Sequence, residues 1–241
     1  EVARLHRVAG VPLKLIHLGA DELPAGAWSG SPAGQAAIQR LGLAGLPGLW
    51  NHFYDRVATI ARRHGARVAG WEELGSRRAA ADGSGPLVPN EHFVKRDFTL
   101  FVWNNLDEAD DLAYRLANAG YPVVLAPATR LYFDMAANGN PGEPGVDWAA
   151  RIDLRDTFDH VPLDALRQRP TQAGSPAGKA VLTAAGRSRV LGLEATLFGE
   201  VMPTRERLER LMLPRLFALA ERAWAPSPSW AETADAAAAD A

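Results

Sequence analysis

The sequence predicts an α/β protein built around a parallel sheet, and two observations support this fold class. Stretches that read as strands alternate with stretches whose apolar residues recur at helical spacing, and this strand–helix unit occurs five times. The expected strands are apolar along their whole length, which is typical of parallel strands that helices cover on both faces. Five such units fit either an open, doubly wound sheet or the later part of a (β/α)8 barrel.

The elements can be placed along the chain from apolar runs and from the glycines and prolines that end them. Strands are expected over residues 11–19, 67–71, 99–103, 121–126 and 190–198. The first of these strands is expected to be buried. Helices are expected over residues 1–10, 49–64 and 107–119. Irregular connections are expected over residues 20–47, 83–89 and 135–189.

A long last helix is expected after Thr204, whose side chain can cap its N-terminus. Its apolar residues recur at helical spacing and are expected to form one buried face. They are Leu208, Leu211, Met212, Leu216, Leu219, Ala220 and Ala223. Pro214 lies inside this helix and is expected to bend it, because proline lacks a backbone donor.

Composition argues against several classes of protein. Of the 241 residues, 47% are apolar and 22% are charged, which is ordinary for a globular protein. The net charge of −2 gives no reason to expect nucleic acid or a membrane surface as a partner. No apolar stretch is long enough to span a bilayer, and the lack of cysteine excludes disulfides and thiolate metal sites. The chain begins at Glu1, so any export signal is expected upstream of it.

A run of acids at the start of the third expected helix is a candidate metal site. Negative charge in a first helical turn complements the helix dipole, and this is the reading we favour. The acids are Asp107, Glu108, Asp110 and Asp111. No metal and no cofactor are therefore expected.

Polar and aromatic residues gather where the expected strands end, at the edge where α/β enzymes bind their ligands. They are Asp21 and Glu22, Trp71 and Glu72, Trp103 and Asn104, Tyr132 and Asp134, and Glu200. Each pair alone is uninformative, since acids often follow strands and tryptophan is often core. Together they suit a sugar, whose C–H faces stack on rings while its hydroxyls bind carboxylates. They also suit hydrolysis through an oxocarbenium-like transition state.

Several motifs resemble, in the same order, those of the family 20 glycoside hydrolases, the β-N-acetylhexosaminidases. His17-Leu18-Gly19-Ala20-Asp21-Glu22 resembles the signature of that family. The later motifs are Gly70-Trp71-Glu72, Val102-Trp103-Asn104, Tyr132-Phe133-Asp134, the insert from Glu143 to Trp148, Gly192 to Glu200, and Leu213 to Trp224. The resemblance therefore covers nearly the whole chain.

The resemblance implies a TIM-type (β/α)8 barrel, of which this chain supplies about strands 4 to 8 with their helices. Residues 1–230 are implied to be the C-terminal portion of the catalytic domain, and residues 231–241 a low-complexity tail. The resemblance also implies retention of configuration, with the substrate's own 2-acetamido oxygen as nucleophile. Glu22 is implied as the acid/base, Asp21 as the group that holds the acetamido N–H, and Tyr132 as a donor to the acetamido carbonyl.

The resemblance implies a further set of substrate-binding residues, namely His17, Trp71, Trp103, Asp134, Trp148, Phe198 and Glu200. Trp71 and Trp103 would form walls of the acetamido pocket, while Asp134 and Glu200 would bind hydroxyls on the far side of the sugar. Phe198 stands where the family usually has tryptophan, so the indole N–H is lost. The implied partner is a carbohydrate that contains N-acetylhexosamine, with no nucleic acid and no membrane. Family resemblance also suggests a bacterial periplasmic or secreted protein.

Two other readings stay open. The chain could be a two-carboxylate retaining β-glycosidase that uses Glu22 and Glu200, although Tyr132 and Asp21 argue against this because they would hold an amide. It could also be an inactive half-barrel that serves as a structural or assembly module. The first three strands of the family barrel are expected upstream of Glu1, so we expect a homo-oligomer or a further part of the same polypeptide as partner.

Overall fold

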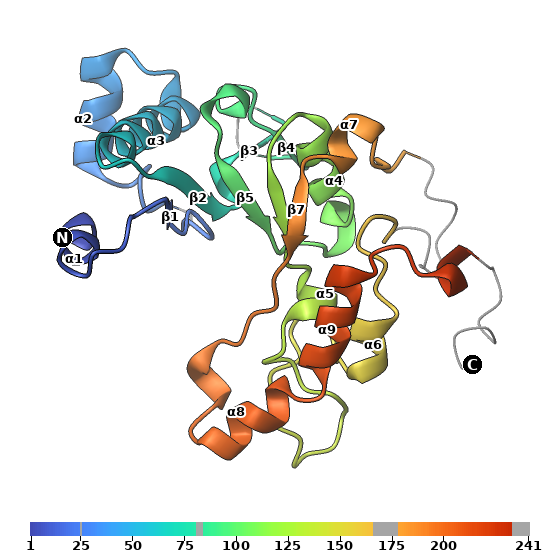
Figure 1. The fold of residues 1–241 in the computed structure, drawn as a ribbon. Coiled ribbons are helices and arrows are strands. Elements are labelled where there is room, and N and C mark those ends of the chain that lie inside the picture. The colour runs from blue at the N-terminus through green and yellow to red at the C-terminus, as the bar shows by residue number, and fades with distance from the viewer. Residues whose placement is uncertain (25, 81–83, 166–177, 233–241) are drawn as a thin grey trace. The chain divides into compact units, whose positions relative to one another are not determined.

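The computed structural model describes residues 1–24, 26–80, 84–165 and 178–232, and it divides into two compact units (Figure 1). Unit 1 comprises Glu1–Phe101 and Ala119–Pro122, and unit 2 comprises Val102–Asn118 and Val123–Ala241. Each unit contains parallel strands together with helices. Most of the predicted tail lies outside the described residues, which end with the short 3-10 helix η5 (Ser229–Glu232).

Three parallel strands form the centre of unit 1. They are β1 (Leu15–His17), β2 (Arg67–Trp71) and the part of β5 (Thr99–Val102) that belongs to this unit. β2 lies in the middle, with Ile16 opposite Val68 on one side and Leu100 opposite Gly70 on the other. Val68 is 3% exposed and Leu100 is fully buried, so the predictions of the second and third strands are confirmed.

The first strand differs from the prediction of a buried strand over residues 11–19. β1 has three residues, and Leu15 is 37% exposed. The physical reason is position, because among the described residues β1 pairs with β2 on one side only. An apolar run shows that a strand can be buried, but it does not show whether a neighbour covers both of its edges.

Three helices accompany the strands of unit 1, namely α1 (Val2–Val8), α2 (Pro32–Leu41) and α3 (Gly45–Arg63). α3 confirms the predicted helix and buries Tyr54, Ala58 and Ala61. α2 corrects the prediction of an irregular connection over residues 20–47. Ser31 caps it by accepting a hydrogen bond from the Gly34 amide, and proline at its first position suits a helix start.

Smaller elements complete unit 1. They are the 3-10 helices η1 (Glu72–Leu74) and η2 (Val94–Arg96) and the antiparallel pair β3 (Ser76–Arg78) and β4 (Leu87–Pro89). The prediction of a turn over residues 83–89 missed this pairing, since Leu87 to Pro89 form β4. The strands are too short to show an alternating pattern of apolar residues.

Unit 2 is built on the parallel strands β6 (Val123–Leu125) and β7 (Val190–Leu193), which confirm the predicted fourth and fifth strands at shorter lengths. Its described α-helices are α4 (Leu112–Asn118), α5 (Ala128–Leu131), α6 (Leu154–Phe158), α7 (Ala184–Arg187), α8 (Arg205–Met212) and α9 (Arg215–Trp224). The 3-10 helices η3 (Asp107–Ala109) and η4 (Gly199–Val201) lie before α4 and α8.

The end of the chain forms two helices rather than one bent helix. Thr204 caps α8, as predicted, by accepting a hydrogen bond from the Arg207 amide. Pro214 separates α8 from α9, because it can neither donate a backbone hydrogen bond nor avoid a clash with the preceding turn.

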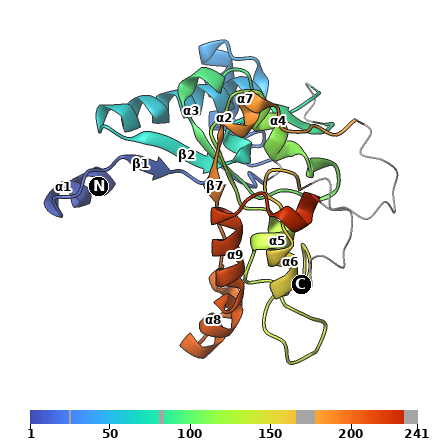
Figure 2. The same cartoon turned by 45° about the vertical axis from the view of Figure 1, so that its right-hand side comes forward.

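The predicted buried face of this segment is confirmed at Leu211 and wrong at Leu208, Leu216 and Ala223, which are exposed. The buried residues of α8 and α9 are Leu211, Arg215, Ala218 and Arg222, whereas Leu216 is 38% exposed. Arginine is rarely buried, so a search for apolar residues assigns it to the surface. α9 packs instead against α6, and the two helices lie side by side in both views of the ribbon (Figures 1 and 2).

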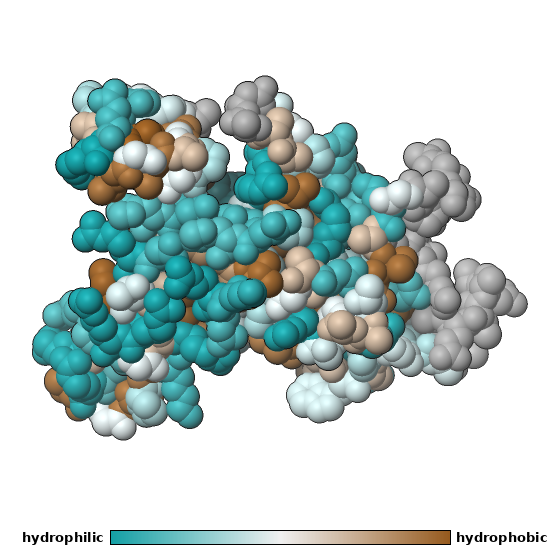
Figure 3. Space-filling view, turned by 90° about the horizontal axis from the view of Figure 1, so that it is seen from above, coloured by the Kyte–Doolittle hydropathy of each residue, from teal (hydrophilic) through white to brown (hydrophobic). Residues whose placement is uncertain are grey.

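Apolar residues also reach the surface of the protein, as one face of it shows (Figure 3). In α9, Phe217 is 69% exposed and Trp224 is 85% exposed. In α1, Val8 is 75% exposed. Among the described residues, no helix combines the length and the apolar character that crossing a membrane requires.

Candidate active site

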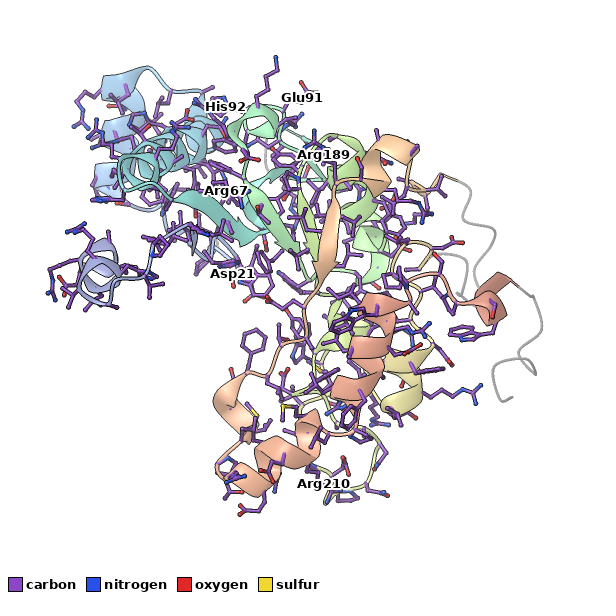
Figure 4. All side chains as sticks on the ribbon, in the orientation of Figure 1. Asp21, Arg67, Glu91, His92, Arg189 and Arg210 are labelled. Carbon is purple, nitrogen blue, oxygen red and sulfur yellow. The ribbon has the colours of Figure 1, made fainter. Side chains whose placement is uncertain are left out.

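The loop that follows β1 carries the two predicted catalytic carboxylates, and Figure 4 labels Asp21 in it. Three of its residues have positive φ angles, 70° at Gly19, 79° at Ala20 and 49° at Glu22. Ala20 and Glu22 have a Cβ atom, so the left-handed conformation costs about 1–2 kcal/mol at each. Backbone strain of this kind concentrates at functional sites. Both carboxylate side chains, Asp21 and Glu22, are exposed.

The end of β2 holds this strained loop in place. The amide of Leu18 donates to the carbonyl oxygen of Ala69 at 2.9 Å, and the amide of Trp71 donates to that of Gly19 at 2.8 Å. A Cβ atom at Gly70 would lie 2.9 Å from the carbonyl oxygen of Gly19. A glycine at this position therefore allows the strand and the loop to come this close.

A third carboxyl group, that of Glu73 in η1, faces the predicted pair. Burial raises the pKa of Glu73 to about 7, and the charges of Asp21 and Glu22 add to this, while hydrogen bonds to the amides of Glu73 and Glu22 oppose it. Sequence reasoning singled out Glu72 instead, which the structure buries completely. A count of residues after a strand does not show which of two adjacent acids turns towards the neighbouring loop.

Tyr54 of α3 also faces this cluster, and sequence reasoning missed it as well. It is 6% exposed, and burial raises its pKa to about 12, with the charges of Asp21 and Glu73 adding to the effect. The hydroxyl group is therefore neutral at physiological pH. Nothing in the local sequence of α3 distinguishes Tyr54 from an ordinary core residue.

His17 and Trp71 pack together at the ends of β1 and β2. Their ring centroids are 5.3 Å apart, and His17 is also 5.0 Å from the ring of Phe101. The Nδ1 atom of His17 accepts a hydrogen bond from the Gly19 amide at 3.2 Å, so the ring helps to shape the loop. Burial lowers the pKa of His17, although the Asp21 carboxylate opposes the shift. A neutral ring with Nδ1 as acceptor is consistent with both observations.

Unit 2 gathers the four predicted aromatic residues into one cluster. The ring of Trp148 lies 6.0 Å from that of Trp103 and 5.9 Å from that of Tyr132, while Tyr132 lies 5.4 Å from Phe198. All three contacts are edge-to-face, the geometry that aromatic quadrupoles favour. Tyr132 is 4% exposed, whereas Trp148 is 55% exposed. The cluster therefore has a buried hydroxyl-bearing ring and an open rim.

Asp134 and Glu200 approach each other beside this cluster. Burial raises the pKa of Asp134, and the charge of Glu200 adds to the shift, while hydrogen bonds to the amides of Asp134 and Phe198 and the charge of Arg215 oppose it. Asp134 is 3% exposed, and its Oδ1 atom has no hydrogen-bond partner in the described structure. A buried carboxyl oxygen of this kind is suited to a ligand hydroxyl.

Arg215 of α9 holds the segment that carries Tyr132 and Asp134. Its guanidinium donates to the carbonyl oxygens of Phe133 at 2.6 Å, of Met135 at 3.1 Å and of Ile152 at 2.8 Å. The guanidinium carbon also lies 5.1 Å from the centre of the Phe133 ring. The side chain is 4% exposed, so these carbonyl groups have little access to water. Sequence reasoning included Arg215 in a motif but did not predict this role.

Other candidate features are a cavity and a run of acids. The cavity, of about 130 Å³ in unit 2, is lined by Asn104, Arg130 and His160 among others. Asn104 is one of the residues predicted to gather where the strands end. Asp110 and Asp111 form ion pairs, with Lys179 at 2.7 Å and Arg115 at 2.9 Å. Among residues with described placement, no group of three or more His, Asp or Glu side chains could hold a metal ion.

A model of the "Glycosyl hydrolase family 20, catalytic domain" matches residues 1–227. The chain belongs to glycosyl hydrolase family 20. The family assignment made from the motifs is thereby confirmed, and the parallel strands and helices are those of part of its (β/α)8 barrel.

Curated relatives in family 20 agree with this assignment. The chain is 30% identical over 236 residues to a beta-hexosaminidase of Vibrio vulnificus, a match that covers 96% of this chain and 27% of that protein. It is 33% identical over 241 residues to beta-hexosaminidase B of Pseudoalteromonas piscicida, covering 93% of this chain and 28% of that protein. The chain thus spans less than a third of the length of these relatives.

A solved family 20 structure has the same fold. It is the exo-β-N-acetylglucosaminidase of Vibrio harveyi in complex with N-acetylglucosamine, which is 29% identical to this chain. The two superpose with a TM-score of 0.69 over 95% of this chain and 31% of the other. The likeness to the family fold therefore extends well beyond one motif.

Proposed function

We propose that this chain is part of a retaining β-N-acetylhexosaminidase. Its substrates would be terminal, non-reducing β-linked N-acetylglucosamine or N-acetylgalactosamine in glycans, chitooligosaccharides or glycoconjugates. The observation that carries this proposal is the strained loop with Asp21 and Glu22, which β2 and His17 hold at the end of β1. The names of the family 20 relatives support the same activity.

In this proposal Glu22 is the acid/base and the acetamido group of the substrate is the nucleophile. The acetamido oxygen attacks the anomeric carbon while the bond to the leaving oxygen breaks, and Glu22 gives that oxygen its proton. Asp21 accepts the acetamido N–H and stabilises the positive charge of the cyclic intermediate. Glu22 then removes a proton from the water molecule that opens this intermediate, so the configuration is retained.

The remaining substrate-binding residues are proposed from the motif order of the family. The Tyr132 hydroxyl would donate to the acetamido carbonyl, and Trp103 and Trp71 would form walls of its pocket. Asp134 and Glu200 would bind sugar hydroxyls, as the unpartnered Oδ1 atom of Asp134 supports. Trp148 and Phe198 are exposed aromatic residues, and the C–H face of a sugar would stack on such rings.

The proposed acid/base role is tested by Glu22→Gln with aryl N-acetyl-β-glucosaminides of graded leaving-group ability. We expect turnover of substrates with poor leaving groups to fall by about 10²–10⁴-fold, because general acid catalysis contributes that much. Activated substrates need little protonation and should lose much less. Glu91→Gln, which changes an exposed acid of the same unit (Figure 4), is the matched control. Equal losses on both classes of substrate would contradict the role of Glu22.

Selectivity tests the proposed nucleophile. An enzyme that depends on the acetamido group should not hydrolyse plain β-glucosides, and a thiazoline mimic of the intermediate should inhibit it strongly. Comparable rates on a β-glucoside would favour a two-carboxylate mechanism instead.

We further propose that the active form has a partner at β1, either a second copy or further polypeptide of the same protein. The free edge of β1 and the exposure of Asp21 and Glu22 support this, since a partner would pair the strand and exclude water from the carboxylates. Light scattering and activity measured on one sample test it. A monodisperse monomer with ordinary hexosaminidase turnover would contradict it.

A further inference from the structure

We propose that His17 is a positioning residue, which acts through the catalytic loop rather than by touching the sugar. This role rests on the proposed function of Asp21 and Glu22. The family resemblance implied that His17 binds the substrate. Its contacts favour the loop instead, because the Nδ1 atom of His17 accepts a hydrogen bond from the Gly19 amide at 3.2 Å. Gly19 begins the turn that carries both carboxylates.

The chain passes from β1 into this turn through three consecutive peptide groups, and each of them is held. The amide of Leu18, in the first group, donates to the carbonyl oxygen of Ala69 at 2.9 Å. The carbonyl oxygen of Gly19, in the third group, accepts from the Trp71 amide at 2.8 Å. Both partners lie in β2. The amide of the middle group is the one that His17 accepts, so the ring fixes the peptide that β2 does not bind through these two contacts.

The orientation of the middle peptide group matters for the carboxylates that follow. Gly19 has a φ of 70° and Ala20 a φ of 79°, and a residue with a Cβ atom leaves this conformation unless its surroundings hold it. A Cβ atom at Gly19 would lie 3.3 Å from the Oδ1 atom of Asp21, so the Asp21 carboxylate folds back over Gly19. A rotation of the backbone at Gly19 would therefore displace the group that is proposed to hold the acetamido N–H.

The His17 ring can serve as a fixed support because aromatic rings of the next two strands hold it. Its centroid lies 5.3 Å from that of Trp71 in β2, at an interplanar angle of 77°. It lies 5.0 Å from that of Phe101 in β5, at an angle of 79°. Both contacts are edge-to-face, a geometry that aromatic rings favour. Turning the ring away from Gly19 would give up both contacts.

The hydrogen bond also defines the chemical form of the ring. A backbone amide can only donate, so the Nδ1 atom of His17 carries no proton, and the proton of the neutral ring is on Nε2. Burial lowers the pKa of His17, although the charge of Asp21 opposes this, and the lower pKa favours the neutral form. His17 therefore acts as an acceptor and not as a charged group.

Three variants separate positioning from contact with the sugar. His17→Phe keeps a ring without an acceptor, His17→Asn places an oxygen where Nδ1 lies, and His17→Gln reaches the position of Nε2. We expect His17→Phe to lower kcat by about 10²-fold with little change in KM, as for a displacement of about 1 Å at a catalytic group. His17→Asn should recover part of this loss, and His17→Gln should not. His64→Asn is the control, because His64 is an exposed histidine of unit 1.

A second measurement does not depend on activity. Nitrogen NMR of the full chain should show that Nδ1 of His17 carries no proton. The Gly19 amide should exchange with solvent more slowly in the wild type and in His17→Asn than in His17→Phe. If no preparation hydrolyses the substrate, the proposed function fails, and these two measurements still decide whether His17 holds Gly19.

Four outcomes would overturn the proposal. They are a protonated Nδ1 atom, equal exchange of the Gly19 amide in the wild type and in His17→Phe, an active His17→Phe variant with unchanged kcat, and recovery by His17→Gln rather than by His17→Asn. The last outcome, together with a raised KM in His17→Phe, would assign His17 to the sugar.

Discussion

Replacement of Arg215 by methionine should lower the free energy of unfolding of unit 2 by more than the replacement of an exposed arginine does. Methionine keeps an unbranched apolar stem but donates no hydrogen bonds, so the carbonyl groups of Phe133, Met135 and Ile152 lose their donor. Each unpaired buried carbonyl costs about 1–3 kcal/mol. The three losses overlap because they share one side chain and the segment can relax, so we expect the free energy of unfolding to fall by about 3–5 kcal/mol.

Urea unfolding followed by circular dichroism measures this loss. Arg205→Ala is the matched control, because Arg205 lies on the adjacent helix and its ion pair with Glu209 is exposed. Such pairs contribute about 0.3–0.5 kcal/mol. Arg215→Lys keeps the charge without the planar fork and should fall between the two. A loss below about 1 kcal/mol for Arg215→Met would refute the reasoning, because it would mean that the carbonyl groups find other donors.

Two further predictions concern a buried histidine and a close backbone contact. The pKa of His160 is lowered to about 3 by burial and by the charges of Arg130 and Arg222. Between pH 6.5 and 3 the His160 ring is therefore neutral in the folded protein, whereas in the unfolded chain it binds a proton. Stability should therefore decline as pH falls from 6.5 towards 3, and less steeply in His160→Gln than in the exposed control His64→Gln. Gly70→Ala should lower turnover by about 10²-fold, because its Cβ would displace the catalytic loop. Gly192→Ala should leave turnover unchanged, because a Cβ at Gly192 has open space around it. Equal slopes for the two histidine variants would contradict the first prediction, and equal turnover of the two glycine variants would contradict the second.

The parts of the fold that the sequence predicts well are those with local causes. β2 and α3 depend on apolar spacing and on the residues that end them, and both occur where predicted. The burial of β1 was not predictable, since it depends on whether a second strand lies beside it. α2 could have been predicted from Ser31 and Pro32, a cap and a helix start that the Gly- and Ala-rich composition obscured.

The residues of the candidate site also fall into those that the sequence predicted and those that it did not. Within unit 1 the structure brings His17 and Trp71 together. Within unit 2 the ring of Trp148 contacts those of Trp103 and Tyr132, and Tyr132 also contacts Phe198. The family resemblance implied both groups, although Tyr132 follows α5 and Trp148 lies in an irregular segment rather than at the end of a strand. Glu73, Tyr54 and Arg215 were missed for one reason. Their roles arise from contacts with residues far away in the sequence, and their own neighbours in the chain carry no sign of them.

Helix α9 buries charged residues and exposes aromatic ones, and this affects how the unfolding of the protein can be measured. Its inner side carries Arg215 and Arg222, while Phe217 and Trp224 face outward. Dyes that report unfolding do so by binding newly exposed apolar surface, and a folded chain with such residues outside already offers binding sites. The fluorescence of Trp224 will also change little on unfolding, because its ring is already in solvent. Circular dichroism follows the backbone and does not depend on these exposed side chains.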